Sequence, residues 1–375
     1  MKSPNLNVQM LVPWTNNKNN WCTYYVLGIY EGTRERSSNK KGQTVSTNSL
    51  ESCEQVQGYE NIDHVYVTLS RVAVVIISVL GIYHVGVLQN LVDDTYSYLL
   101  STWVFNCVYF ETFFATFCYA VVIVYPWGID KIKCLDRYKV HPSVQYQHVT
   151  ISFIVQQAIL YMLPLMALDT VMVKKYGGVG IDPEVWVEKR ESILQTTRAL
   201  PLEPPTVLAV VCQLFASFVL YDALFFAFHL LLHKNFYLYK YIHKYHHDHE
   251  MLHGHVTNQL TIIERISLVL TANFALKVFN SHPFTRTVFV PIFVTILVEN
   301  HTGYDLPFGY HRTVPFGLVG GSVKHFQHHV NGKRCYQPIF TYLDKLFDNY
   351  WNKKTVWCVD EDVICVKDIH VHIHT

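Results

Sequence analysis

Two five-residue stretches of this chain combine a residue type and a spacing suited to metal chemistry. Both read His-x-x-His-His: HKYHH occupies residues 243–247 and HFQHH occupies residues 325–329. Positions i, i+3 and i+4 of a helix project from the same face about one turn apart. We therefore expect each stretch to be helical and to direct its three imidazoles toward one point.

Other histidines extend this pattern. His229 and His233 stand at i, i+4 in HLLLH, at the end of an apolar run, and His301 begins HTGYDLP. One isolated pair would be ordinary, but helically spaced histidines concentrated between residues 229 and 329 point to metal binding. The candidate metal ligands are His229, His233, His243, His246, His247, His301, His325, His328 and His329.

The size of this set indicates how many ions it holds and which metal they are. A first-row ion takes about four to six ligands, so nine imidazoles predict two ions; imidazole suits zinc, copper, iron and nickel. A catalytic zinc site normally uses three protein ligands and an open position, far fewer than this chain offers. Two iron ions that react with dioxygen as co-substrate fit the ligand count, and the cofactor would carry the redox chemistry.

Two acids near these histidines are candidate catalytic residues. Asp222 lies two helical turns before His229 inside an apolar run, where an acid is costly and indicates function. It is expected to orient a ligand imidazole or to bond a neighbour. Asp305 follows His301 by four positions and either holds the N–H of a ligand ring or caps the GYDLP turn.

The remaining histidines of this region are weaker candidates. His249, His253 and His255 lack the i, i+3, i+4 phasing onto the other histidines. His282 precedes a proline and is expected in a turn, whereas the spacing of His311 does not assign it to the site. None of these five is included in the predicted ligand set.

Composition places this chemistry in a membrane protein. Half of the 375 residues are apolar and only 16% are charged, against about 25% charged residues in soluble domains. The formal net charge of +1 gives no basic signal for nucleic acid. Nine dispersed cysteines form no CxxC pair, which argues against a disulfide framework or a zinc–thiolate site.

Apolar runs provide the elements that would position the histidines. Four of them approach the ~20 residues that a helix needs to cross a bilayer: one from about residue 68, then 99–127, 149–173 and 207–229. A further apolar region is split by NSHPFTR and predicts a hairpin of two short helices, 266–279 and 288–298. The predicted fold is an all-α, polytopic integral membrane protein with a cytosolic, helical, histidine-box cap that holds two metal ions.

The charges of the loops predict which side of the membrane each segment faces, and the composition predicts the boundaries of the regions. The connection at residues 128–142 is rich in lysine and arginine, whereas the preceding one is acidic, so the positive-inside rule places the N-terminus and both five-residue stretches in the cytosol. We expect a polar, weakly ordered leader at 1–65, transmembrane helices and loops at 66–206, a catalytic region at 207–350, and a C-terminal tail at 351–375.

The histidine stretches together resemble the histidine boxes of the fatty acid hydroxylase/sterol desaturase superfamily, and most closely those of its sterol hydroxylases. The resemblance covers about residues 130–350, with matching stretches at 137–149, 220–234, 239–247, 280–285 and 299–329. The chain departs from the pattern at DHEMLHGHVTNQL, where those hydroxylases have apolar or small residues, and in a charged loop at 174–203.

The resemblance implies an enzyme of the endoplasmic reticulum membrane that hydroxylates a sterol. It would bind two irons through the nine histidines and use dioxygen and electrons from a cytochrome b5-type donor and its reductase. Basic residues expected on the cytosolic side would attract an acidic donor: Lys234, Lys240, Lys244, Lys324, Lys333 and Arg334.

Several alternatives remain open at this point. Members of the same superfamily oxidise C4-methyl groups of sterols, desaturate sterol rings or cleave alkyl-glycerol ethers. Outside enzymes, a histidine-rich metal transporter and an inactive sterol-binding protein are the alternatives. A transporter would spread its ligands through its membrane segments, whereas these histidines gather at helix ends and in two short clusters.

Overall fold

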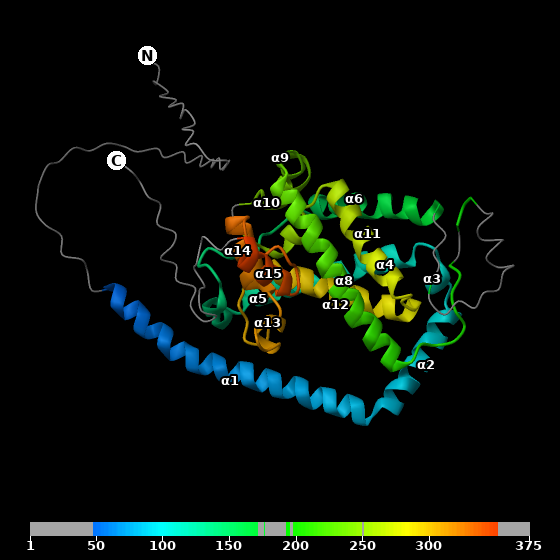
Figure 1. Cartoon of the computed structure of the whole chain (residues 1–375), viewed down its shortest axis with the longest axis horizontal. Helices are drawn as coiled ribbons and strands as arrows, with labels where there is room; N and C mark the ends of the chain where they lie inside the picture. Colours follow the sequence, from blue (N-terminus) through cyan, green and yellow to red (C-terminus); the bar gives the residue numbers. More distant parts are fainter. Residues whose placement is uncertain (1–47, 172–175, 177–192, 196–197, 250, 352–375) are drawn as a thin grey trace, which may run out of the picture. The chain divides into compact units, whose positions relative to one another are not determined.

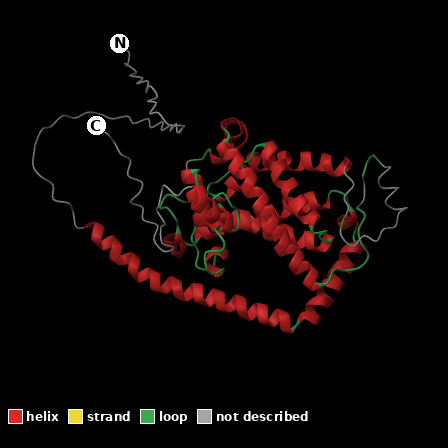
Figure 2. Ribbon diagram, in the orientation of Figure 1, coloured by secondary structure: helices red, strands yellow, loops and turns green. Residues whose placement is uncertain are grey.

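The computed structural model describes residues 48–171, 176, 193–195, 198–249 and 251–351. Within these residues the chain consists of helices and loops with two isolated bridges and no strand, as Figure 2 shows. The predicted all-α fold is therefore confirmed. The C-terminal tail from residue 352, residues 1–47 of the predicted leader and most of the charged loop at 174–203 lie outside the described residues.

The chain divides into two units, Met1–Cys53 and Glu54–Thr375, and the second contains every element discussed below except the first residues of α1. Its first half comprises α1 (Asn48–Tyr83, which begins in the first unit), α2 (Val85–Ser101), α3 (Trp103–Asn106), α4 (Phe110–Val122), α5 (Val124–Lys131), η1 (Lys133–Tyr138) and α6 (Ile151–Val171). Its second half comprises α8 (Val207–Lys234), α9 (Phe236–Leu238), η2 (Tyr239–His243), α10 (Lys244–His247), η3 (Gly254–Asn258), α11 (Ile262–Val278), α12 (Pro283–Asn300), α13 (Tyr310–Thr313), α14 (Gly321–Asn331) and α15 (Tyr342–Trp351).

Among the residues that the structure describes, four helical segments are long and apolar enough to cross a membrane, which confirms the membrane-protein prediction: His64–Tyr83, Phe110–Lys131, Ile151–Val171 and Val207–Lys234. Helix α1 starts at Asn48, inside the predicted leader, but its apolar part begins at His64. The second apolar run was expected to form one span from residue 99, but α2 ends at Ser101. Thr102 then caps a new helix, α3, by accepting a hydrogen bond from the amide of Phe105.

The predicted hairpin is present as α11 and α12. Asn280 takes a left-handed conformation (φ 46°) in the turn between them. His282 then caps α12 by accepting a hydrogen bond from the amide of Phe284, with Pro283 at the first helical position, where its missing N–H costs nothing. His282 is thus the turn residue that its position before a proline predicts.

Helix α8 packs against both α11 and α12, and the three helices share one core cluster (Figure 1). The small side chains of Ala272 and Ala275 on α11 are buried against Tyr221 of α8 and Phe289 of α12. Within a membrane, such contacts stabilise the helices through close van der Waals packing, which small residues like these alanines allow. This packing fixes the C-terminal end of α8, which carries His229 and His233.

Candidate metal centre

The structure gathers all nine predicted histidines into two groups. The first histidine group consists of His229, His233, His243, His247 and His328, and the second consists of His246, His301, His325 and His329. Within each group one nitrogen of every ring lies within 4.8 Å of the others. Two metal sites were predicted from the ligand count, and the side chains form two clusters. That these rings bind metal stays a prediction.

Each His-x-x-His-His stretch is divided between the two groups, which corrects the expectation that its three rings meet at one point. His243 and His247 join the first group, whereas His246 joins the second. In the other stretch the i and i+4 histidines join the second group and His328 joins the first. Residues advance by about 100° around a helix, so i+4 and i+3 fall on opposite sides of i. Each stretch therefore contributes to both groups.

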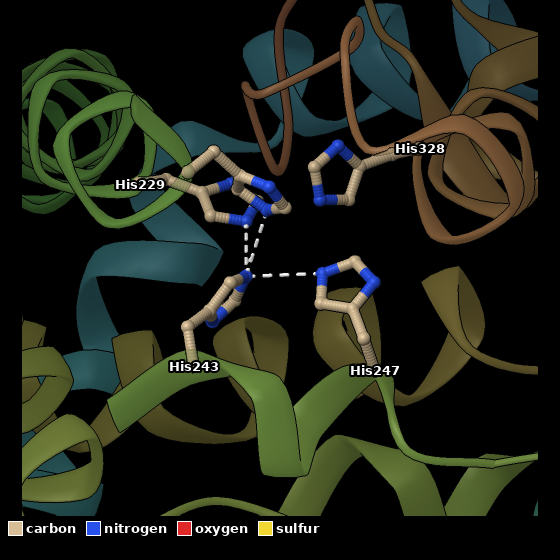
Figure 3. Close-up of side chains that lie close together, drawn as sticks. His229, His243, His247 and His328 are labelled. Carbon is tan, nitrogen blue, oxygen red and sulfur yellow. Dashed lines mark hydrogen bonds between the residues drawn. The ribbon is translucent and has the colours of Figure 1, made fainter. Parts of the chain in front are cut away.

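His243 lies at the centre of the first group. Its Nε2 is 3.0 Å from Nε2 of His229, 2.9 Å from Nε2 of His233 and 3.0 Å from Nε2 of His247. Figure 3 shows the rings of this group directed at a common space, with His328 opposite His243. Nε2 of His328 is buried without a hydrogen-bond partner. The π-helical turn η2 ends at His243 and sets the direction of this ring.

The second group has similar spacing. Nε2 of His325 is 2.9 Å from Nε2 of His301 and 3.1 Å from Nε2 of His329. Nε2 of His246 lies 3.4 Å from Nε2 of His301. Helices α10, α12 and α14 thus bring rings from three parts of the chain to one place.

Backbone carbonyls fix which nitrogen of several rings carries the proton. Nδ1 of His229 donates to the carbonyl of Tyr336 at 2.8 Å, and Nδ1 of His301 donates to the carbonyl of Leu297 at 2.7 Å. Nδ1 of His328 donates to the carbonyl of Arg334 at 2.8 Å. A carbonyl only accepts, so each Nε2 is left with a lone pair. Lone pairs that converge from several rings repel one another unless a cation lies between them, so this donor set fits a metal ion.

Burial keeps these rings neutral, as metal ligands must be. Burial, followed by the unfavourable proximity of His328, lowers the pKa of His243 to about 3. Burial likewise lowers the pKa of His301 to about 3 and that of His328 to about 4. At neutral pH all three imidazoles therefore present a lone pair.

Glu264 contacts a predicted ligand directly, although its position in the sequence did not identify it as a candidate. Its Oε1 lies 2.7 Å from Nδ1 of His243, and both side chains are almost fully buried. Burial raises the pKa of Glu264 to about 9. A cation on His243 would favour the carboxylate, so metal binding would release a proton from Glu264.

Asp222 bonds a neighbouring segment rather than a ligand ring. Its carboxylate accepts hydrogen bonds from the amides of Ile339 and Phe340 at 2.8 and 3.1 Å and from the side chain of Gln337. This segment follows Tyr336, whose carbonyl holds His229. Of the two roles expected for Asp222, these contacts give it the second, and it reaches His229 only through the backbone.

Asp305 likewise contacts no ring of either group through its described hydrogen bonds. Its carboxylate accepts from Nε2 of His311 at 2.8 Å and from Nε of Arg312 at 2.8 Å. Burial alone would raise the pKa of Asp305, but these two donors hold it well below its usual range. It fixes the loop after α12 and gives His311 a structural partner, so of the two roles expected for Asp305 these contacts do not give it the first.

His249 lies behind the second group, outside both ligand clusters. Its Nε2 is 3.0 Å from Nδ1 of His329. His255 is further away and pairs through Nε2 with the hydroxyl of Tyr146 at 2.7 Å. The histidines between residues 248 and 260 therefore form a layer around the centre, consistent with their absence from the predicted ligand set.

Comparisons with known proteins agree with this site. A family model described as fatty acid hydroxylase matches residues 214–349. Cholesterol 25-hydroxylase of Mus musculus is 28% identical over 237 residues, which cover 61% of this chain and 70% of the relative. A cholesterol 25-hydroxylase-like protein of Danio rerio is 30% identical over 247 residues (65% and 89%), and cholesterol 25-hydroxylase of Homo sapiens is 29% identical over 268 residues (69% and 89%). No solved structure matches the chain.

Proposed function

Because this chain belongs to the fatty acid hydroxylase family, we propose that it is a membrane-bound sterol hydroxylase whose nine histidines hold two iron ions. Membership of the family supports a hydroxylase, which is an oxidoreductase. The apolar helices indicate a membrane protein. The substrate and the metal are the parts that we propose.

The observation that carries the proposal is the convergence of buried, neutral Nε2 atoms in two adjacent groups. Five rings supply the first group and four the second, which suits two ions better than one. His229, His301 and His328 have the tautomer that leaves Nε2 free for a metal. The curated relatives include cholesterol 25-hydroxylases, which supports a sterol as the substrate.

Iron held here would supply dioxygen-dependent oxidation of an unactivated C–H bond. The residues of the chain position it and keep water away. His243 is held by Glu264 at 2.7 Å and His229 by the carbonyl of Tyr336, so neither ring can turn its lone pair aside. His229, His243 and His328 are each at most 2% exposed, which limits access of solvent to the first group.

The cellular setting is also part of the proposal. The enzyme would lie in the endoplasmic reticulum membrane with both histidine groups on the cytosolic side. A cytochrome b5-type protein and its reductase would supply electrons, and basic residues near the centre such as Lys244 would favour an acidic donor. We assign catalysis to residues 207–350 and helical anchoring to residues 66–206.

The test is lipid mass spectrometry on cells with and without the full-length chain. We expect a sterol to gain the mass of one oxygen only when the chain is present. His246→Ala should abolish this product and lower the bound iron, because His246 belongs to the second group. Full product formation by His246→Ala, or no oxidised sterol from wild type supplied with an electron donor, would refute the proposal.

A further inference from the structure

A cavity of about 480 Å³ lies among α4, α6, α11 and α12. Its wall is mostly apolar, with side chains such as Leu165, Ala272 and Phe289. This volume falls in the range of pockets that enclose one small molecule. The cavity is separate from the two histidine groups, none of whose members lines it.

One end of the cavity adjoins the metal centre. Leu297 lines it, and the carbonyl of Leu297 accepts the hydrogen bond from Nδ1 of His301. Arg265 lines it as well, next in sequence to Glu264, which holds His243. The wall at this end is thus hydrogen-bonded to His301 of the second group and lies next to Glu264, which contacts His243 of the first group.

The opposite end carries a buried polar cluster, which we call the anchor cluster: Glu111, Thr112, Asp169 and Arg286. Nε and Nη2 of Arg286 donate to the two carboxylate oxygens of Glu111, each at 2.8 Å. The hydroxyl of Thr112 donates to Asp169 at 2.8 Å. All four side chains line the cavity. Ionisable residues inside apolar helices are costly and indicate function.

Helix geometry gives the distance between the two ends. Arg286 and Leu297 both lie on α12, eleven positions apart, which at 1.5 Å per residue is about 16 Å. Helix α11 runs from Arg265 at the metal end to Leu276, which shares a core cluster with Phe289 of α12, again eleven positions. An occupant that spans the cavity would therefore place its far end about 16 Å from its anchored group, at the wall formed by Leu297, which bonds His301, and Arg265, which adjoins Glu264.

The charges of the anchor end indicate which chemical group it takes. Two carboxylates, Glu111 and Asp169, are balanced by two guanidinium groups, because Arg198 also lies 3.5 Å from Glu111. A buried site of balanced charge favours a neutral group that both donates and accepts hydrogen bonds over an anion. Lys277, which also lines the cavity, is exposed to solvent.

Building on the proposed function, we propose that the anchor cluster binds the hydroxyl group of an elongated lipid alcohol, and that the length of the cavity selects the carbon that is oxidised. The anchor residues act by positioning the substrate and take no part in the oxidation. They would hold the polar end of the lipid, while its apolar body would occupy the cavity along α11 and α12.

Equilibrium binding to the metal-free, full-length protein in detergent tests this proposal. The probes are a radiolabelled 3-hydroxysterol and its 3-methyl ether, with a fatty acid anion as competitor. We expect wild type to bind the alcohol about five- to tenfold more tightly than the ether, as one hydrogen bond would give. Thr112→Val and Asp169→Asn should both reduce this preference to about one.

Thr116→Val is the matched control. Thr116 lines the same cavity one turn further along α4, but its hydroxyl donates to the backbone carbonyl of Thr112 at 2.9 Å. This variant should keep the preference of wild type. Equal binding of alcohol and ether to wild type, loss of the preference in Thr116→Val, or competition by the fatty acid anion as strong as that of the alcohol would overturn the proposal.

Product analysis separates positioning from a purely structural role. With iron and an electron donor, wild type should oxidise one carbon, whereas Thr112→Val should spread oxygen over neighbouring carbons. An unchanged product position in Thr112→Val would contradict the anchor. Because binding is measured without metal, the two proposals can fail separately. If the protein prefers the alcohol but forms no oxidised sterol, only the proposed function is refuted. If it forms oxidised sterol but does not prefer the alcohol, only the anchor is refuted.

Discussion

Replacing Glu264 should weaken metal binding at the first histidine group and leave the second unchanged. Glu264 contacts Nδ1 of His243, the ring whose Nε2 lies within 3.0 Å of three other ring nitrogens. In Glu264→Gln the side chain keeps its size, and its amide oxygen can still accept from Nδ1. The glutamine cannot become an anion, however, so it cannot stabilise the charge that a bound cation brings to His243.

The expected loss is a factor of about 10–100 in metal affinity, or about 1.4–2.7 kcal/mol. The side chains of His243 and Glu264 are 1% and 3% exposed, so solvent screens their interaction little. In the second group the outer nitrogen of His301 bonds the carbonyl of Leu297 and that of His329 faces His249, so the substitution removes nothing there.

A chelator titration of the iron-loaded, full-length protein measures this effect, with retained iron determined by elemental mass spectrometry. Glu264→Gln should lose half of its iron at about 10–100 times less chelator than wild type and keep the other half. Glu299→Gln is the matched control, because Glu299 accepts from the amide of Tyr310 at 3.2 Å and should keep both ions. Retention of both ions by Glu264→Gln at wild-type chelator levels, or simultaneous loss of both, would refute the reasoning.

Three further predictions concern stability. Asp222→Ala leaves two buried amides without an acceptor and should cost about 1–3 kcal/mol, seen as a lower melting temperature in detergent; an unchanged value would show that its contacts are dispensable. Gly321→Ala places a methyl group against the ring of His311 at a φ of 60° and should lower the melting temperature, whereas Gly128→Ala, which meets nothing, should not. The metal-free protein should lose stability as the pH falls below about 6.5 toward about 3, because burial lowers the pKa of ligands such as His243 to about 3 in the folded state, while the unfolded chain takes up protons near pH 6.5. A melting temperature that rises on acidification would contradict this.

The histidine set could be predicted from the sequence because helical spacing is a local property. The i, i+4 pair His229 and His233 lies within α8 and the stretch at 325–329 within α14, whereas the stretch at 243–247 keeps its phase across the junction of η2 and α10. The division of each stretch between two groups follows from the same 100° rotation, but only once the partner rings are known. A single stretch does not specify on which of its sides a metal lies.

The partners of the rings could not be predicted. Glu264 lies 21 positions from His243 on another helix, and only the packing of α11 against η2 brings them together. The carbonyls of Leu297 and Tyr336 carry no sequence signal, since every residue has one. Asp222 could be recognised as a candidate because it is an acid in an apolar run. The segment that it bonds could not be predicted, because that segment lies more than a hundred positions away in the sequence.

The iron content of the purified, full-length protein tests the central claim most directly. We expect two iron ions per chain at saturation, and one ion in His328→Ala, which removes a ring of the first group, or in His325→Ala, which removes a ring of the second. Wild-type protein that oxidises sterol while holding no more than one ion, or either variant retaining two at wild-type affinity, would contradict it.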